Sequence, residues 1–326
     1  MKVTVWYNNN DIRIEEREKP KPQANEILFK VHSCGICGSD IVEWYRLPRA
    51  PLIPGHEASG EIVEIGSSVD NYKKGDRIFV APKIGCSNCK YCKKGHHSVC
   101  PNAKARLPGA FSEFVLIPEE LVNNAVFLIP KDMSYDTATF VEPLACVVRA
   151  QKFAGIKEND NVLILGSGMS GLLHIKLALN KKAIVTSTDI NENRLKFAEK
   201  LGARTFNAKE ELKEKFDVVI VCSGAMPAIE QAWKAVDLAG TIILFTVPHP
   251  DKDVIVPVND FWRKEVKIMA SYYCAPDDMK EAFELLSSGK IKVDDMITHR
   301  LPLKDIEKGF KLVTEGDESL KVIIKP

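Results

Sequence analysis

From about residue 161 onward, apolar runs of strand length alternate with runs of helical pattern. One apolar run, Val162–Leu165, leads directly into a glycine-rich loop at residues 166–171, and a helical pattern begins within that loop. Alternation of this kind is typical of βαβ units, which build a doubly wound parallel sheet. The sequence therefore predicts an α/β domain over about residues 149–290. The other expected strands are Ala183–Ser187, Asp217–Cys222, Thr241–Phe245 and Val266–Ala270, and the expected helices are Ser170–Asn180, Asn193–Leu201 and Pro227–Leu238.

The glycine-rich loop has the spacing of a phosphate-binding turn. Gly166 would permit the tight turn, Gly168 would let the backbone approach a pyrophosphate, and Gly171 would let helix and strand pack closely. Asp189 ends the next expected strand, close to the position about 20 residues on at which a ribose-binding acid is expected. A glycine turn in any α/β fold is the alternative, and the strand, the helix and the acid around the loop argue against it. We therefore expect a bound dinucleotide, with its phosphates at the helix N-terminus.

The residues near Asp189 bear on which dinucleotide is bound. A carboxylate at this position hydrogen-bonds the ribose hydroxyls and repels a 2′-phosphate, which favours NAD. Arg194 follows five residues later, and a nearby arginine is how NADP is accommodated, so NADP stays open as the less favoured alternative. Val247 follows an expected strand, at the carboxyl edge of the sheet where nicotinamide binds. The predicted cofactor-binding residues are Gly166, Gly168, Met169, Ser170, Gly171, Asp189, Arg194 and Val247.

Four cysteines lie within fifteen residues, in a segment that lacks apolar residues for a core of its own. They are Cys86, Cys89, Cys92 and Cys100. Four thiolates complete a tetrahedral zinc site that is closed to substrate and fixes the loop around it. An iron–sulfur cluster also uses four cysteines and is one alternative. A nucleic-acid-binding zinc module is another, although the balanced charge of the chain speaks against it. We expect a structural zinc lobe at about residues 85–101.

Cysteine, histidine and acidic residues also gather near the start of the chain. Cys37-Gly38-Ser39-Asp40 is followed within twenty residues by Gly55-His56-Glu57. A catalytic zinc takes three protein ligands from such residue types and keeps one position open. The region up to about residue 148 carries short extended runs and many prolines, which favours an all-β, loop-rich domain without long helices.

Composition excludes several classes of protein. A chain of 326 residues has room for two domains, and 45% hydrophobic with 27% charged residues argues against disorder. The net charge of +1 offers no electrostatic case for nucleic acid or an anionic membrane as the main partner. No apolar run is long enough to span a bilayer, and the N-terminus does not have the pattern of a signal peptide. Nine cysteines at partly metal-like spacing suit a reducing compartment, so a soluble, cytoplasmic protein is expected.

Taken together, these features resemble the zinc-containing medium-chain alcohol dehydrogenase family over nearly the whole chain. Val141–Cys146 looks like the branch that contains polyol, sorbitol and threonine dehydrogenases. The resemblance implies a GroES-like β-barrel catalytic domain at residues 1–148 and 291–326, a Rossmann domain at 149–290, and a dimer or tetramer. The motifs that carry the resemblance are Cys34–Asp40, Gly55–Glu57, Gly75–Arg77, the four-cysteine lobe and the Gly166–Gly171 loop.

The family pattern also implies the ligands of the catalytic zinc. Cys37 and His56 match two of them, and Glu57 matches either a ligand or a group close behind the metal. Glu142 sits where this branch carries a glutamate near zinc. Cys146 is its competitor, because alcohol dehydrogenases place a third cysteine in this neighbourhood. We prefer Glu142, since a carboxylate can bind or retreat and leave one position open.

Two further residues of the first motif have roles implied by the family. Asp40 would orient His56 through the second ring nitrogen. Ser39 would accept the proton of an alcohol polarised by zinc and pass it towards the nicotinamide ribose, while hydride moves to the nicotinamide. Family members often have a histidine two residues after the aspartate as the outlet of this relay, but here that residue is Val42. Glu43 or water could take its place.

The expected activity is therefore hydride transfer from a secondary alcohol or polyol to NAD, giving a ketone. A dehydrogenase of threonine, a sugar phosphate or a simple alcohol is the first alternative. A zinc-independent reductase that uses NADPH and a non-enzymatic dinucleotide sensor are the others. The segment between Asp40 and Pro54 is short and aromatic, which suits a small or medium alcohol, and no residue cluster in it demands phosphate.

Overall fold

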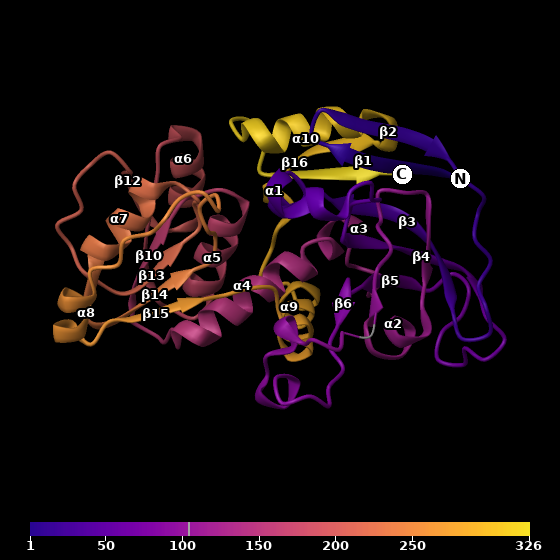
Figure 1. Ribbon diagram of the computed structural model, residues 1–326, viewed down its shortest axis with the longest axis horizontal. Coiled ribbons are helices and arrows are strands. Elements are labelled where there is room, and N and C mark those ends of the chain that lie inside the picture. The colour runs from indigo at the N-terminus through magenta and orange to yellow at the C-terminus, as the bar shows by residue number, and fades with distance from the viewer. Residues whose placement is uncertain (104) are drawn as a thin grey trace. The chain divides into compact units, whose positions relative to one another are not determined.

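The chain forms two compact units in a computed structural model that describes residues 1–103 and 105–326 (Figure 1). The first unit comprises Met1–Ala145 and Cys274–Pro326, and the second comprises Cys146–Tyr273. The chain thus leaves the first unit and returns to it. Helix α9 (Pro276–Ser287) belongs to the first unit, whereas the expected domain limit at residue 290 assigned it to the second.

A six-stranded parallel sheet is the centre of the second unit. Its strand order is β12-β11-β10-β13-β14-β15, with helices packed on the sheet (Figure 1). The residues Val162–Leu165 of β10 are completely buried, as expected for a strand covered on both faces. The predicted doubly wound sheet is confirmed. The strands are β10 (Asn161–Leu165), β11 (Ile184–Asp189), β12 (Arg204–Asn207), β13 (Phe216–Val221), β14 (Val236–Leu244) and β15 (Lys267–Ala270), and the helices are α5 (Met169–Asn180), α6 (Glu192–Leu201), α7 (Met226–Ala235) and α8 (Val258–Lys264).

The edge strand β12 is not among the strands expected from the sequence. Its four residues are polar or half-buried and carry no apolar run. The strand exists because its backbone pairs with β11 in register, Thr186 with Arg204 through Asp189 with Asn207. Pairing with a neighbour, rather than residue pattern, therefore determines this strand.

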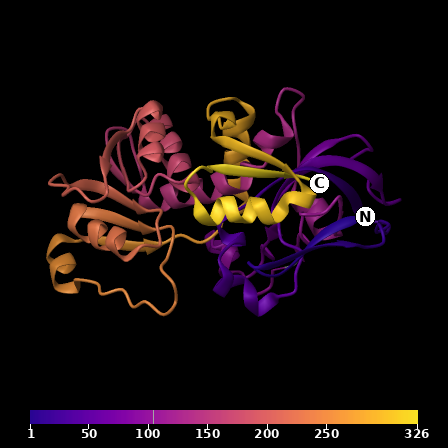
Figure 2. The same cartoon turned by 90° about the horizontal axis from the view of Figure 1, so that it is seen from above.

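The first unit is built around a mixed sheet. The strand order is β16-β17-β3-β4-β5-β9, and β8 pairs with β3 beside this path. Helix α10 lies along β16 and β17, which Figure 2 shows in yellow. The strands of the unit are β1 (Lys2–Asn8), β2 (Asp11–Glu16), β3 (Ile27–Gly35), β4 (Glu57–Ile65), β5 (Arg77–Val80), β6 (Lys83–Ile84), β7 (Ala105–Arg106), β8 (Phe114–Ile117), β9 (Val126–Leu128), β16 (Ile297–Pro302) and β17 (Lys321–Lys325), and the α-helices besides α9 are α1 (Glu43–Arg46), α2 (Glu119–Asn124), α3 (Tyr135–Ala138) and α10 (Ile306–Glu315).

Three strands of this sheet meet where the predicted catalytic motifs lie. Gly35 at the end of β3 pairs with Glu57 at the start of β4, and it also pairs with Ile323 of β17. Cys37 lies two residues after β3, and His56 precedes β4 directly. Antiparallel pairing therefore brings the two motifs side by side, and it adds a strand from the end of the chain.

A long helix begins in the stretch that was expected to lack one. Helix α4 (Val141–Ala154) has 14 residues and runs from the first unit into the second. The prolines that argued against long helices lie before it, and Pro143 falls in its first turn, where a missing N–H costs nothing. Among the described residues, no helix is both long and apolar enough to cross a membrane.

Candidate metal centres and cofactor site

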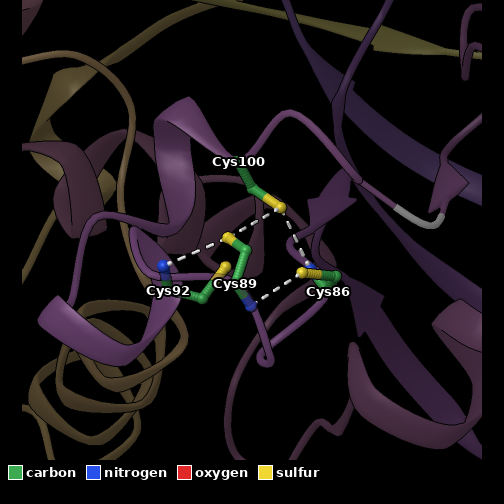
Figure 3. Close-up of side chains that lie close together, drawn as sticks. All are labelled: Cys86, Cys89, Cys92 and Cys100. Atoms are coloured by element: carbon green, nitrogen blue, oxygen red, sulfur yellow. Dashed lines mark hydrogen bonds between the residues drawn. The ribbon is translucent and has the colours of Figure 1, made fainter.

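The four cysteines of the lobe converge on one point (Figure 3). Their sulfur atoms all lie within 4.8 Å of one another. Backbone N–H groups of the loop donate to three of these sulfurs, from Cys86 to Cys100 at 3.3 Å, from Cys89 to Cys86 at 3.3 Å and from Cys92 to Cys89 at 3.5 Å. Such donors stabilise thiolates, which are the form that binds metal. Four converging sulfurs fit a tetrahedral zinc ion.

The chain passes close to the cysteine cluster at Gly85. A side chain at Gly85 would place its Cβ 2.9 Å from Cys92 Sγ. Hydrogen bonds from the backbone of Asn88 and Cys89 lower the pKa of the Cys86 thiol to about 6. Burial raises the pKa of the Cys92 thiol to about 12. The Cys86 and Cys92 thiols thus differ in acidity, and a bound cation would favour the thiolate form of the ligands.

The second group with metal-ligand geometry is Cys37, His56 and Glu57. One ligand atom of each lies within 4.8 Å of the others. Glu57 is completely buried, and its Oε1 has no hydrogen-bond partner among the described residues. A buried carboxylate oxygen without a partner costs free energy, so its position beside a thiol and an imidazole fits a metal ion. Cysteine, histidine and carboxylate are a donor set of catalytic zinc sites.

The other oxygen of Glu57 is held by a residue that the sequence analysis did not single out. Lys321, in β17, is completely buried and forms an ion pair with Glu57 Oε2. Its ammonium nitrogen also lies 5.3 Å from the centre of the Phe140 ring. Gly35 makes room for this pair, because a Cβ there would lie 2.2 Å from Glu57 Oε2 and 2.5 Å from Lys321 Cε. The pair thus fixes Oε2 of Glu57 and leaves Oε1 without a hydrogen-bond partner among the described residues.

Asp40 connects the two predicted motifs. Its side chain is buried, its Oδ2 accepts a hydrogen bond from the backbone N–H of Cys37 at 3.1 Å, and its Oδ1 lies 3.4 Å from His56 Nδ1. Burial raises the pKa of the Asp40 carboxyl, but the charges of His56 and Arg46 outweigh this, so the pKa is lower than usual. Burial likewise lowers the pKa of His56, and Asp40 and Cys37 reverse this, so the pKa is well above its ordinary value. The carboxylate is therefore in place to fix the ring orientation of His56.

Ser39 lies beside the sulfur of Cys37. Its hydroxyl and its backbone N–H approach Cys37 Sγ at 3.3 and 3.4 Å. Arg46 of α1 donates from Nη2 to Ser39 Oγ at 3.0 Å. Glu43, a suggested substitute for the missing relay histidine, accepts the backbone N–H of Asn9 at 3.0 Å. That carboxylate is thus engaged with the N-terminal hairpin.

Glu142 and Cys146 both lie on α4. Glu142 is buried in the first turn of the helix, and its carboxylate is not part of the close group formed by the three described ligands. Cys146 is the first residue of the second unit. Neither residue belongs to the group in which the ligand atoms of Cys37, His56 and Glu57 all lie within 4.8 Å of one another.

The glycine-rich loop of the second unit has the backbone that its spacing predicted. Gly166 has φ of 102°, which favours glycine, and its N–H donates to Thr188 O at 2.8 Å. A Cβ on Gly171 would lie 1.8 Å from Gly166 O, so only glycine lets α5 start this close to β10. A Cβ on Gly168 would meet no atom closer than 3.7 Å, the Nη1 of Arg194. The position of a side chain on Gly168 therefore remains free, which suits the close approach of a pyrophosphate. Met169 and Ser170 are the first residues of α5.

Asp189 stands at the end of β11, against this loop. Its Oδ2 accepts the backbone N–H of Ser167 at 2.8 Å, and its Oδ1 accepts that of Asn191 at 2.9 Å. Arg194 Nη1 lies 3.8 Å from Asp189 Oδ2. Val247 follows β14 and is half exposed, with its carbonyl oxygen 2.9 Å from the position of a Cβ on Gly224. Ser167 and Asn191 are additions to the predicted site residues, and they hold Asp189 through backbone groups that no side-chain pattern reveals.

Residues in each of the two units match known protein families. Residues 23–130 match the model of the alcohol dehydrogenase GroES-like domain, and residues 171–288 match that of the zinc-binding dehydrogenases. The D-arabitol-phosphate dehydrogenase of Enterococcus avium is 33% identical over 94% of this chain and 91% of its own. The sorbitol dehydrogenase of Bacillus subtilis is 30% identical over 100% and 97%. A zinc-binding dehydrogenase structure from Sinorhizobium meliloti bound to NADP has a TM-score of 0.89 and 28% identity, covering 100% of this chain and 99% of that chain.

Proposed function

Because this chain belongs to the zinc-binding medium-chain dehydrogenase family, we propose that it oxidises a secondary alcohol of a polyol to a ketone with NAD. The family assignment establishes a zinc-dependent dehydrogenase that acts on CH–OH groups with NAD or NADP. The observation that carries the finer proposal is the group Cys37, His56 and Glu57, with its buried, unpartnered carboxylate oxygen. The sorbitol dehydrogenase among its relatives supports a polyol substrate.

Two zinc ions and a nicotinamide fit the residues present. Bound zinc would supply Lewis-acid polarisation of the substrate oxygen, and the nicotinamide would accept hydride. Cys37, His56 and Glu57 would hold the catalytic ion, and the four cysteines of the lobe would hold the structural one.

The remaining residues of the first motif orient groups and handle the proton. Asp40 holds His56 through Nδ1 and holds the backbone of Cys37, so both ligands keep their direction. We propose that the Ser39 hydroxyl takes the proton of the substrate alcohol, since it already lies beside Cys37 Sγ. With Val42 in place of a relay histidine and Glu43 bound to Asn9, water is the proposed outlet for that proton.

Glu142 is proposed to stand near the metal without being one of its three close ligands. Its burial in the first turn of α4 supports a role in the site, and Glu57 already supplies the carboxylate of the close group. Cys146 is the weaker candidate, because a third thiolate is not needed once Glu57 is counted.

The main test is NADH formation, followed by absorbance, with zinc-loaded protein and a panel of polyols, threonine and simple secondary alcohols. Turnover on a polyol that is lost in Cys37→Ser, together with zinc content falling from two to one per chain, is the expected result. Zinc content also separates the alternatives, since a zinc-independent reductase would not need the second ion. Binding of zinc and NAD without turnover of any alcohol would favour the sensor.

We propose NAD rather than NADP as the cofactor because Asp189 lies at the glycine loop and carries a negative charge. Replacement of Asp189 by asparagine keeps its shape and removes the repulsion of a 2′-phosphate, while Arg194 remains nearby. The ratio of kcat/KM for NADP to that for NAD should rise about ten-fold, the effect of roughly 1.4 kcal/mol. Asp217→Asn, at the opposite end of the sheet, is the control and should leave the ratio unchanged. An unchanged ratio in Asp189→Asn would contradict the assignment.

A sugar phosphate is the second candidate substrate, and the D-arabitol-phosphate dehydrogenase relative favours it. The same assay distinguishes the two candidates when each polyol is paired with its phosphate monoester. The cytoplasmic location expected from composition stays a prediction.

We propose that the protein assembles as a dimer or tetramer through the edge strand β15. Among the described residues β15 is the last strand of its sheet, and two strongly exposed apolar side chains, Val258 (66% exposed) and Trp262 (78%), line a shallow hollow together with Ile268 of β15. Exposed apolar groups of this size are typical of interfaces between subunits. Light scattering should give a multiple of the monomer mass for the natural chain and a lower mass for Trp262→Glu. A natural chain that is monomeric would exclude this assembly.

A further inference from the structure

Arg46, the last residue of helix α1, is a nearly buried cation that follows the catalytic motif. Only 9% of the residue is exposed. Its Nη2 lies 2.6 Å from Asp40 Oδ1, which explains how a charge is tolerated there. Nη2 also donates to Ser39 Oγ at 3.0 Å, and Nε donates to Ser39 O at 2.9 Å. The guanidinium is therefore two hydrogen bonds away from Cys37 Sγ, through Ser39.

These contacts use only some of the N–H donors of the Arg46 guanidinium. An arginine side chain carries five N–H donors in a planar fork. Nε and Nη2 make all the hydrogen bonds of Arg46 to other described residues, so Nη1 and its two N–H groups remain available. Nη1 is not among the buried side-chain atoms that lack a partner, so solvent reaches it and a ligand can take its N–H groups.

A second arginine lies on the same short segment. Arg49 is exposed, its Nη2 donates to Tyr45 O at 3.2 Å, and its guanidinium lies 4.7 Å from the centre of the Tyr45 ring. The Arg46 guanidinium lies 5.5 Å from the same ring. Arg49 has no carboxylate partner among the described residues. Two guanidinium groups therefore lie near one tyrosine ring, and one of them, that of Arg46, contacts Ser39.

Lysine and arginine side chains on the β6–β7 ribbon add to this positive region. Lys83 of β6 pairs across the ribbon with Arg106 of β7. Burial, and then the charge of Arg106, lowers the pKa of Lys83, and Tyr45 is near enough to act on it as well. Two of the carboxylates near Ser39 are paired with cations, Asp40 with Arg46 and Glu57 with Lys321, and Glu43 accepts the backbone N–H of Asn9. Cationic side chains thus surround Tyr45, with Arg46 and Arg49 near its ring and Lys83 close enough to feel its charge.

We propose that Arg46 and Arg49 bind an oxyanion carried by the substrate, either a phosphate monoester or a carboxylate, while the hydroxyl to be oxidised lies at Ser39. Guanidinium groups bind such oxyanions through paired N–H donors. This inference rests on the proposed dehydrogenase function and narrows its substrate to an anionic polyol. It revises the expectation that nothing between Asp40 and Pro54 demands phosphate, because the fold places both guanidinium groups near the Tyr45 ring and one of them on Ser39.

The test compares three substrates of equal chain length: a free pentitol, its phosphate monoester and the corresponding aldonate. The variants are Arg46→Lys, which keeps the charge beside Asp40 but loses the fork, and Arg49→Met. Arg13→Met is the matched control, since Arg13 is an exposed arginine that also lies over a tyrosine, Tyr7, and is paired with Asp11. Calorimetric titration of zinc-loaded protein with inorganic phosphate gives a readout that does not depend on turnover.

The natural chain should prefer one of the two anionic substrates, and that preference identifies the oxyanion. Each site variant should lower kcat/KM for this substrate about ten-fold more than for the free pentitol, as expected for one charge-assisted hydrogen bond. If the phosphate monoester is preferred, Arg46→Lys and Arg49→Met should also weaken the binding of inorganic phosphate. Arg13→Met should change neither the ratio of kcat/KM values nor phosphate binding. Equal use of free and anionic pentitol, unaltered in ratio by the variants, would overturn this inference and leave the proposed function standing. Failure to oxidise any of the panel of alcohols would instead count against the proposed function.

Discussion

Replacement of Gly35 by alanine is expected to release the metal from Cys37, His56 and Glu57. The new Cβ would lie 2.2 Å from Glu57 Oε2 and 2.7 Å from Lys321 Nζ. Both partners are completely buried, so neither can move aside without breaking their ion pair. Loss of the groups that orient metal ligands costs about 10–100-fold in metal affinity or activity, and we expect the upper end of this range because Glu57 itself is displaced. Zinc content should fall from two to one per chain, as measured on dialysed protein.

Gly38→Ala is the matched control for this prediction. Gly38 lies in the catalytic motif itself, yet a Cβ there would meet no atom within 4 Å. Zinc content should therefore stay at two per chain in this variant. Lys321→Arg, which keeps a cation beside Glu57, should retain more zinc than Lys321→Met, which leaves a buried carboxylate without its partner. Full zinc occupancy in both Gly35→Ala and Lys321→Met would show that the ion pair does not position Glu57.

Substitution of serine for Cys100 should remove the other zinc ion and destabilise the lobe. The lobe has a small buried cluster made of the cysteines themselves, with no aliphatic or aromatic side chain in it. Its folded conformation therefore depends on the bound metal, whose binding free energy is folding free energy. A loss of several kcal/mol corresponds to a fall of about 10 °C in the midpoint of thermal unfolding for a chain of this size.

Cys274→Ser provides the comparison for the lobe variant. Cys274 is a buried thiol that lies outside both metal groups, so zinc content should be unchanged. A Cys100→Ser protein that keeps two zinc ions and its unfolding midpoint would refute the structural role of the lobe. A lobe metal that proves to be iron, identified by elemental analysis, would support the iron–sulfur alternative instead.

Much of the fold follows from local patterns. The parallel sheet was predictable because Val162–Leu165 and Asp217–Cys222 are apolar runs of strand length separated by helical patterns, and a strand covered on both faces needs such runs. The glycine loop was predictable because Gly166 and Gly171 meet steric limits that only glycine satisfies. Strand β12 was not, because its pairing with β11 leaves no mark on its own residues. Helix α4 was missed because the prolines that argued against long helices lie before it, and Pro143 is tolerated in its first turn.

The chemistry of the two metal groups was determined by the sequence, since residue type and spacing decide which donor atoms a short loop can present. Cys86, Cys89, Cys92 and Cys100 lie close together along the chain, so few other arrangements were open to them. Only the tertiary structure decided the surroundings of those donors. Lys321 reaches Glu57 across 264 positions, and Arg46 turns back onto Ser39 and Asp40 through a one-turn helix. Strand pairing brings such groups together, and no local pattern encodes it. The sequence alone does not distinguish Lys321 from the other lysines, whereas the fold buries it beside Glu57.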